Sequence, residues 1–191
     1  MKRHYKKVTI VLLMLITIIS FTTTALASIR YGTGQISGGA KNILYWRDSS
    51  VYEYKESVDY GIGYWNGISS NISVNRTTTK SYSRCDVYWD NCLPGNYETP
   101  GLTEHMLNGQ VTTNFDIDWY WCKIHLNQNK FNYDGMTYDQ RKGSVCHEYG
   151  HFLGLSHASF IGSIMCTLES NRAVQTPQVF DKQEVIAIYG S

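Results

Sequence analysis

The stretch HEYGHFLGLSH, residues 147–157, decides the fold and the chemistry that we expect of this chain. His147 and His151 are four residues apart, so on a helix their imidazoles project from one face and can reach the same metal ion. Gly154 can adopt the left-handed backbone conformation that ends a helix and turns the chain. We therefore expect His157 to return toward the first two histidines as a third ligand.

Three imidazole ligands leave one position of a tetrahedral zinc ion open to water, which is typical of a catalytic site rather than a structural one. Zinc lowers the pKa of such a water to about 7. Glu148 follows the first histidine and is placed to take the proton of that water as a general base without being a ligand. The predicted reaction is hydrolysis of a peptide bond.

The length of the motif gives it its specificity. The five-residue core HExxH also arises by chance in unrelated chains. Gly154 and His157 at fixed offsets make the longer pattern specific. With a methionine in Ser163-Ile164-Met165, the sequence resembles the zinc signature and Met-turn of the metzincin endopeptidases. The short interval from His157 to Met165 is similar to that of the matrixins, the matrix-metalloproteinase type.

This resemblance implies a role for each residue of the site. It implies one catalytic zinc ion held by three ligands, His147, His151 and His157. Glu148 would be the catalytic residue, and Met165 would form an apolar floor beneath the imidazoles. Simple core packing is the alternative interpretation of Met165, and it places the side chain in nearly the same position. An extended peptide substrate would pair with an edge of the sheet.

Local patterns predict the elements of the first half. Residues 42–47 are aliphatic and aromatic, which favours a strand. Ser50 and Glu53 form a capping-box pattern for a helix that ends near Gly67. Apolar residues at spacings of three and four give that helix one apolar stripe: Val51, Tyr54, Val58, Ile62 and Trp65.

The second half alternates strands and loops before two helices. Four segments have a strand-like composition: residues 72–83, 85–89, 102–110 and 117–126. Two polar or proline- and glycine-rich segments predict loops: residues 91–101 and 127–135. Thr137 with Gln140 predicts a capping box for the helix that carries the motif. Thr176 and Pro177 open a last helix whose core-facing residues are predicted to be Val179, Val185, Ile186 and Ile188.

This order of elements is similar to a matrixin catalytic domain over nearly all of residues 35–191. The resemblance implies the α+β class and a zincin-like metzincin domain. Its sheet would be mixed, mostly parallel and twisted, with about five strands. A first-half helix, an active-site helix and a C-terminal helix would accompany the sheet. We expect residues 28–191 to form a single metzincin-like catalytic domain.

The first 27 residues read as a secretory signal peptide. A basic start precedes an apolar run at residues 8–19, and Ala25-Leu26-Ala27 fits a cleavage site. A membrane anchor is the alternative, but the run is shorter than the roughly 20 residues that a spanning helix needs. We therefore expect a secreted, extracellular protein with no stable membrane association after cleavage.

Charge and length limit the classes of partner. Removal of the signal leaves 164 of 191 residues and 13 of 17 basic residues, against 16 acidic ones, a balance of about −3. No basic block remains, which argues against nucleic acid as a partner. We expect a monomer of one domain acting on a protein or peptide substrate.

Five cysteines remain in a protein expected to be exported, where disulfides can form. Cys85 with Cys92 would close a small local loop, so we predict a disulfide between these two. Pairing among Cys122, Cys146 and Cys166 cannot be deduced from the sequence. Cys146 directly precedes the first histidine, but a buried or bridged cysteine is favoured over a metal ligand because its side chain leaves the helix in another direction.

The other histidines and acids have weaker claims to a site. His105 and His125 are interpreted as surface or strand residues rather than ligands. Structural calcium would draw on Asp116, Asp118 and Asp134, with His105 as a candidate for a second zinc, but their spacing matches no calcium loop. These residues are therefore interpreted as solvated.

Two rival functions stay open beside the endopeptidase. The first is a secreted peptide- or glycan-binding module with a vestigial zinc site, since 14% of the residues are aromatic. Such a module has no use for Glu148 between two histidines, so this residue favours catalysis. The second is a secreted toxin that cleaves one target protein by the same chemistry, which only identification of the substrate would distinguish.

Overall fold

The computed structural model describes residues 28–90, 99–133, 135–167 and 172–191. Its sheet has the strand order β2-β1-β3-β6-β4-β5. Neighbouring strands among β2, β1, β3 and β6 are parallel, whereas β4 runs antiparallel to both β6 and β5. The strands are β1 (Ile43–Arg47), β2 (Val74–Arg76), β3 (Cys85–Asp90), β4 (Gly101–Leu107), β5 (Gln110–Thr112) and β6 (Trp121–Asn127). This confirms the predicted α+β class and the mostly parallel sheet, with six strands where about five were expected.

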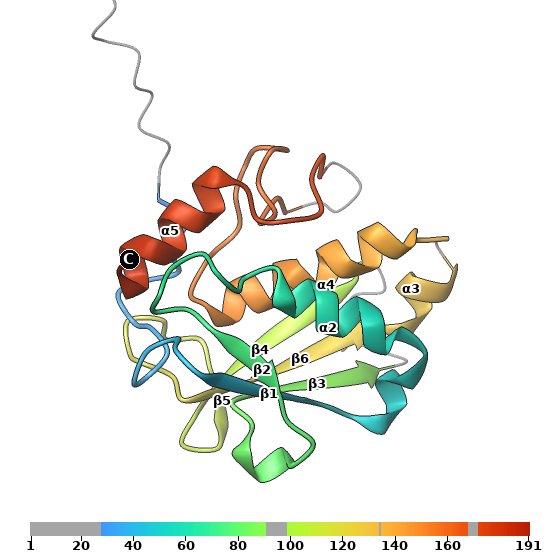
Figure 1. Cartoon of the computed structure of the whole chain (residues 1–191), viewed down its shortest axis with the longest axis horizontal. Coiled ribbons are helices and arrows are strands. Elements are labelled where there is room, and N and C mark those ends of the chain that lie inside the picture. Colours follow the sequence, from blue (N-terminus) through green and yellow to red (C-terminus); the bar gives the residue numbers. More distant parts are fainter. Residues whose placement is uncertain (1–27, 91–98, 134, 168–171) are drawn as a thin grey trace, which may run out of the picture.

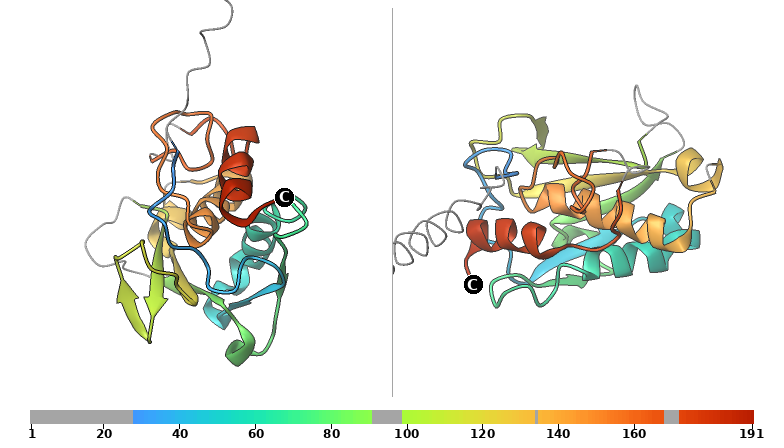
Figure 2. Two further views of the ribbon diagram at one scale, coloured as in Figure 1. Left: turned by 90° about the vertical axis from the view of Figure 1, so that its left-hand side faces the viewer. Right: turned by 90° about the horizontal axis from the view of Figure 1, so that it is seen from above.

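Two helices cover one face of the sheet. Figure 1 shows α2 (Lys55–Gly63) and α4 (Tyr138–Phe152) above the strands, and Figure 2 shows them side by side. A glycine is needed where they meet, because a Cβ atom at Gly61 would lie 2.6 Å from the carbonyl oxygen of Lys142 and 2.7 Å from Cβ of Val145. The sheet supports α2 and α4, and α4 is the helix that carries the histidine motif.

The core lies between the sheet and these two helices, and two buried tryptophans fix α4 within it. The indole Nε1 of Trp65 donates a hydrogen bond to the Cys146 carbonyl over 3.0 Å. Trp119 donates in the same way to the Phe152 carbonyl over 3.1 Å. Both indoles are fully buried, and a buried N–H without an acceptor would cost free energy of folding. These two hydrogen bonds therefore stabilise the position of α4.

The first helix begins differently from the prediction. A 3-10 segment, η1 (Ser49–Tyr54), precedes α2, and the helical path ends at Gly63 before a turn that reaches Gly67, where φ is +75°. The cap is Asp48 rather than Ser50, because the Asp48 carboxylate accepts from the Ser50 N–H over 2.9 Å. The predicted apolar stripe is nonetheless turned inward: Val51, Val58, Ile62 and Trp65 are fully buried.

Three segments between the helices also differ from their predictions. Only Val74–Arg76 of residues 72–83 is a strand, and η2 (Lys80–Tyr82) interrupts the rest. The predicted strand at residues 102–110 is not continuous but belongs to the hairpin β4–β5, since Asn108 and Gly109 both take positive φ, 52° and 81°, as a two-residue hairpin turn requires. Within the predicted loop at 127–135, α3 (Gln128–Tyr133) forms a short helix.

The last helix, α5 (Val179–Tyr189), lies near the C-terminal end of α4 (Figure 1). Val185 is fully buried as predicted, but Val179 is 71% exposed, so its predicted place in the core is wrong. Val179 is the first residue of the helix and lies on the opposite side from the core stripe. Among the residues described, no helix has both the length and the apolar character to cross a membrane.

Candidate metal centre

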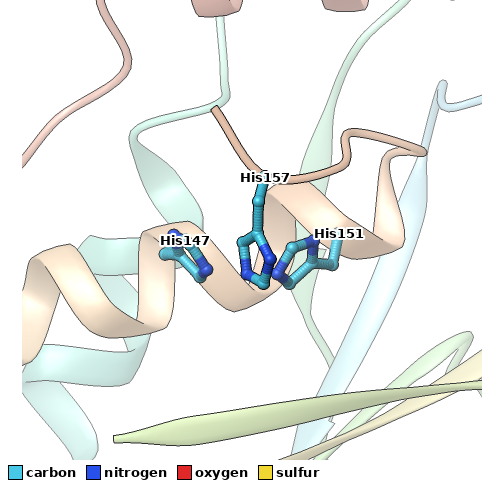
Figure 3. Close-up of side chains that lie close together, drawn as sticks. All are labelled: His147, His151 and His157. Atoms are coloured by element: carbon cyan, nitrogen blue, oxygen red, sulfur yellow. The ribbon is translucent and has the colours of Figure 1, made fainter. Parts of the chain in front are cut away.

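The helix α4 presents two histidines on one face. Its start is the predicted capping box, in which the Thr137 hydroxyl accepts from the Gln140 N–H over 3.2 Å and the Gln140 side chain accepts from the Thr137 N–H over 2.8 Å. His147 and His151 lie one turn apart, 7% and 5% exposed. Figure 3 shows their imidazoles projecting from the same side of the helix. The local sequence is therefore sufficient to bring these two rings together.

The chain turns back directly after α4. Gly154 has φ of +95°, and its N–H donates to the His151 carbonyl over 2.9 Å. This left-handed residue returns the chain over the helix, so that His157 points down between the other two rings (Figure 3). One ligand atom from each of the three histidines lies within 4.8 Å of the other two. The predicted convergence of the three imidazoles is thus present in the structure.

Backbone carbonyls set the orientation of the first two rings. Nδ1 of His147 lies 2.8 Å from the Ile164 carbonyl oxygen, and Nδ1 of His151 lies 2.8 Å from that of Leu155. A carbonyl oxygen can only accept, so each Nδ1 must carry the proton in these bonds. The lone pair is then on Nε2, which is the atom left to bind a metal ion.

The Met-turn is tied to the last helix by a buried carboxylate. Asp181 of α5 is fully buried and accepts from the Ser163 hydroxyl, from the Ile164 N–H over 3.1 Å and from the Gln178 N–H over 2.7 Å. Through the Ile164 carbonyl this network reaches His147. α5 therefore takes part in positioning the first histidine.

Met165 packs against α4 at Gly150. It is fully buried, and a Cβ atom at Gly150 would come within 2.5 Å of its sulfur. The absence of a side chain at Gly150 therefore lets the Met165 thioether pack directly under the helix, between the turns that carry the two histidines.

Glu148 is buried beside β4 and is held by a threonine. It is 4% exposed, and its Oε2 accepts from the Thr103 hydroxyl over 2.8 Å. Burial raises the pKa of Glu148 to about 7, with the Thr103 hydrogen bond and the charge of Arg172 acting in the opposite direction. A carboxyl group with a pKa near neutrality is suited to exchange a proton with substrate or water.

The electrostatic environment keeps all three imidazoles neutral. Burial lowers the pKa of His147 to about 3, and the charge of Arg172 adds to the effect. The pKa of His151 is lowered well below its usual value, first by burial and then by the neighbouring histidines. Burial also lowers the pKa of His157, the most exposed of the three. A divalent cation would therefore meet three unprotonated nitrogen ligands, which is the donor set that zinc favours.

No protein-family model matches the chain, and no curated protein does. Among solved structures, the archaemetzincin of Methanopyrus kandleri matches with a TM-score of 0.52 at 10% identity, over 77% of this chain and 95% of that one. Two structures of myroilysin match with TM-scores of 0.48 and 0.47, each at 14% identity, over 88% and 87% of this chain and 97% and 98% of those chains.

The chain has a metzincin-type fold. The similarity concerns the fold, and nothing in it favours the matrixin type over other metzincins. The fold does account for the position of the motif: the mostly parallel sheet supports α4, and the turn after α4 returns His157 to the first two histidines.

Two residues that contact the metal centre of this metzincin-type fold were not expected from the sequence. The Tyr31 hydroxyl lies 2.9 Å from Nδ1 of His151, although 120 residues separate the two in the chain. His105 donates from Nε2 to the His151 carbonyl over 2.8 Å and is 2% exposed, so the prediction of a solvated residue was wrong for it. Neither residue carries a local signal, because each reaches the site only through the packing of distant segments.

The other candidates lie away from the centre. His125 on β6 is bonded at Nδ1 to Asp90 and at Nε2, over 3.2 Å, to Glu104. It therefore links β6 to its two neighbouring strands, β3 and β4. Among the residues that the structure describes, the three histidines of the motif are the only group of metal-binding side chains close enough to share one ion.

Of the acids considered for calcium, Asp116 and Asp118 are exposed, as predicted, and each accepts a hydrogen bond from the backbone. Asp116 accepts from the Thr33 N–H over 3.1 Å, and Asp118 accepts from the Gln35 N–H over 3.0 Å. Both side chains therefore hold the segment that precedes β1. Asp134 lies outside the described residues.

Among the described residues, no cysteine belongs to the group of side chains close enough to share one metal ion. Cys85 and Cys122 are buried thiols directly opposite each other on β3 and β6. Cys146 is buried in the core, as favoured over a ligand role. Cys92 lies outside the described residues, but Cys85 is a free thiol, so the predicted disulfide between Cys85 and Cys92 is not formed in this structure.

Proposed function

We propose that this protein is a zinc-dependent metalloendopeptidase. His147, His151 and His157 would be its zinc ligands and Glu148 its general base. The observation that carries the proposal is the convergence of three neutral imidazoles within 4.8 Å, two of them with Nε2 freed by a carbonyl at Nδ1. One zinc ion fits this donor set, and the metzincin-type fold supports the assignment.

Zinc bound to three ligands would supply Lewis acidity, polarising a substrate carbonyl and acidifying a water molecule. Glu148 would take the proton of that water as it attacks and pass it to the leaving amine. The raised pKa of Glu148, about 7, allows the same carboxyl group to accept and then release a proton near neutral pH. The Thr103 hydroxyl would hold the carboxylate in place through both steps.

The substrate would lie along β4 as an added strand. Thr103 on β4 contacts Glu148, so this strand borders the reacting groups. β5 pairs only with His105–Leu107 of β4, and among the described residues no strand pairs with the outer side of residues 101–104. A peptide in extended form could therefore bond to the backbone there, beside the three histidines.

We further propose that the enzyme is of the matrixin type and acts outside the cell. The short interval between His157 and Met165 supports the first statement, and the signal-like residues 1–27 support the second. The predicted substrate is a protein or peptide, and the predicted active form is a monomer.

The proposal is tested by incubating the purified protein with a mixed peptide library and identifying products by mass spectrometry. We expect cleavage that stops with a chelator and in Glu148→Ala, while that variant still binds about one zinc ion per chain. Glu53→Gln, a change of an exposed acid on η1, serves as the matched control and should cleave as the wild type does. Cleavage that persists in Glu148→Ala would remove this residue from the mechanism. Zinc binding without any cleavage would favour the peptide- or glycan-binding alternative.

A further inference from the structure

The segment Ile29–Tyr31 forms a strap over the turn that joins His151 to His157. The Tyr31 N–H donates to the Gly154 carbonyl over 3.1 Å, and the Ser156 N–H donates to the Ile29 carbonyl. Arg30 and Leu155 are paired as an antiparallel bridge between these bonds. The strap therefore pairs with the turn that carries the third histidine, from a part of the chain that the motif does not include.

The side chain of Tyr31 continues from the strap to the second histidine. Its ring stacks on Phe115 with centroids 4.3 Å apart and an interplanar angle of 18°. Its hydroxyl lies 2.9 Å from Nδ1 of His151. Stacking fixes where the ring lies, so the hydroxyl is held at this position rather than reaching it by chance rotation.

The hydroxyl and a carbonyl share the same imidazole nitrogen. The Leu155 carbonyl, 2.8 Å from Nδ1 of His151, requires that Nδ1 carry a proton. The Tyr31 oxygen is then a second acceptor for that N–H. Two acceptors on one N–H resist rotation of the ring and raise the basicity of Nε2, the atom on the metal side.

We propose that Tyr31 is a positioning residue of the metal centre, and that docking of the strap and binding of the metal ion favour each other. The proposal rests on the zinc site of the proposed function and adds a residue and a segment to it. Because coupling between two binding events is reciprocal, a docked strap should raise zinc affinity, and bound zinc should hold the strap closed by the same factor.

Zinc affinity tests the first half of this proposal. Tyr31→Phe keeps the ring on Phe115 and removes only the hydroxyl. Its matched control is Tyr45→Phe, which removes a buried hydroxyl that donates to Asp59 on α2, over 2.6 Å. Competition with a chelator of known affinity should show roughly tenfold weaker zinc binding for Tyr31→Phe and a change of less than about twofold for Tyr45→Phe. Equal affinity of Tyr31→Phe and wild type would overturn the assignment.

Hydrogen exchange tests the second half without any variant. The amide N–H groups of Tyr31 and Ser156 should exchange more slowly when zinc is added to the wild-type protein, because both close the strap. Unchanged exchange at both amides would overturn the linkage. These measurements do not depend on peptidase activity. Zinc binding without peptide cleavage would contradict the proposed peptidase function, but the zinc affinities and the exchange rates would still test the role of Tyr31 and of the strap. Normal peptide cleavage together with equal zinc affinities of Tyr31→Phe and the wild type would contradict only the role of Tyr31.

Discussion

Thr103 of β4 donates its hydroxyl hydrogen bond to Oε2 of Glu148 on α4 over 2.8 Å, which joins the strand proposed to bind substrate to the proposed general base. This bond lowers the pKa of Glu148 and opposes the larger effect of burial, which raises it. A residue that belongs to the sheet and not to the histidine motif thus adjusts the pKa of the proposed base.

Removing the Thr103 hydroxyl should raise the pKa of Glu148 above about 7. A hydrogen bond to a charged group stabilises it by about 1.5–3 kcal/mol, so we expect Thr103→Val to raise this pKa by about one unit or more. In a profile of kcat/KM against pH, the acid limb should move to higher pH by that amount. Thr113→Val changes an exposed threonine and should leave the profile in place. An unmoved acid limb in Thr103→Val would show that the bond does not act on the base.

A side chain at position 101 should displace Glu148. A Cβ atom at Gly101 would lie 2.7 Å from Cγ of Glu148, closer than any relaxed contact. We expect Gly101→Ala to lower kcat by about 10²-fold, as displacements of about 1 Å at a reacting group do, with zinc content unchanged. Gly63→Ala adds a methyl group where no atom lies within 4 Å, so it should keep full activity. Full activity in Gly101→Ala would mean that Glu148 has room to move without consequence.

Loss of the Asp181 carboxylate should destabilise the protein and disturb the site together. In Asp181→Ala the buried donors of Ser163 and Ile164 and the partly buried N–H of Gln178 would lose their acceptor. We expect a loss of about 3 kcal/mol in the free energy of unfolding, measured in urea on the metal-free protein. Asp139→Ala, a change of an exposed acid paired with Lys142, should cost less than about 1 kcal/mol. Comparable losses in the two variants would contradict the role given to Asp181.

The metal-free protein should lose stability in acid through His105. Burial lowers the pKa of His105 to about 4 from 6.5, so the folded state resists the proton that the unfolded chain accepts. The stabilisation is present above pH 6.5 and is lost as the pH falls through about 4.

A variant that cannot titrate at this position isolates the effect. Glutamine can still donate to the His151 carbonyl, so His105→Gln keeps the bond of the wild type. Between pH 7 and pH 4, the wild type should lose about 3 kcal/mol more unfolding free energy than His105→Gln, as a shift of about 2.5 units implies. Parallel losses in the two proteins would show that His105 is not buried as a neutral group.

The sequence by itself determined the parts of this protein that depend on local spacing. Two histidines four residues apart share a helix face, the Thr137–Gln140 capping box starts that helix, and Gly154 permits the turn that returns His157. The apolar stripe of the first helix was also readable, because burial repeats with the helical period. Each of these features is set by residues that follow one another closely in the sequence.

Only the tertiary structure decided which distant residues surround the motif. Tyr31, Thr103 and Asp181 reach the site from the N-terminal strap, from β4 and from α5. The hairpin β4–β5 and the inward turn of His105 likewise follow from pairing and packing with other elements. No period or spacing in the chain encodes these contacts, because they form when the sheet and α4 bury their shared apolar surface and bring segments separated by many tens of residues together.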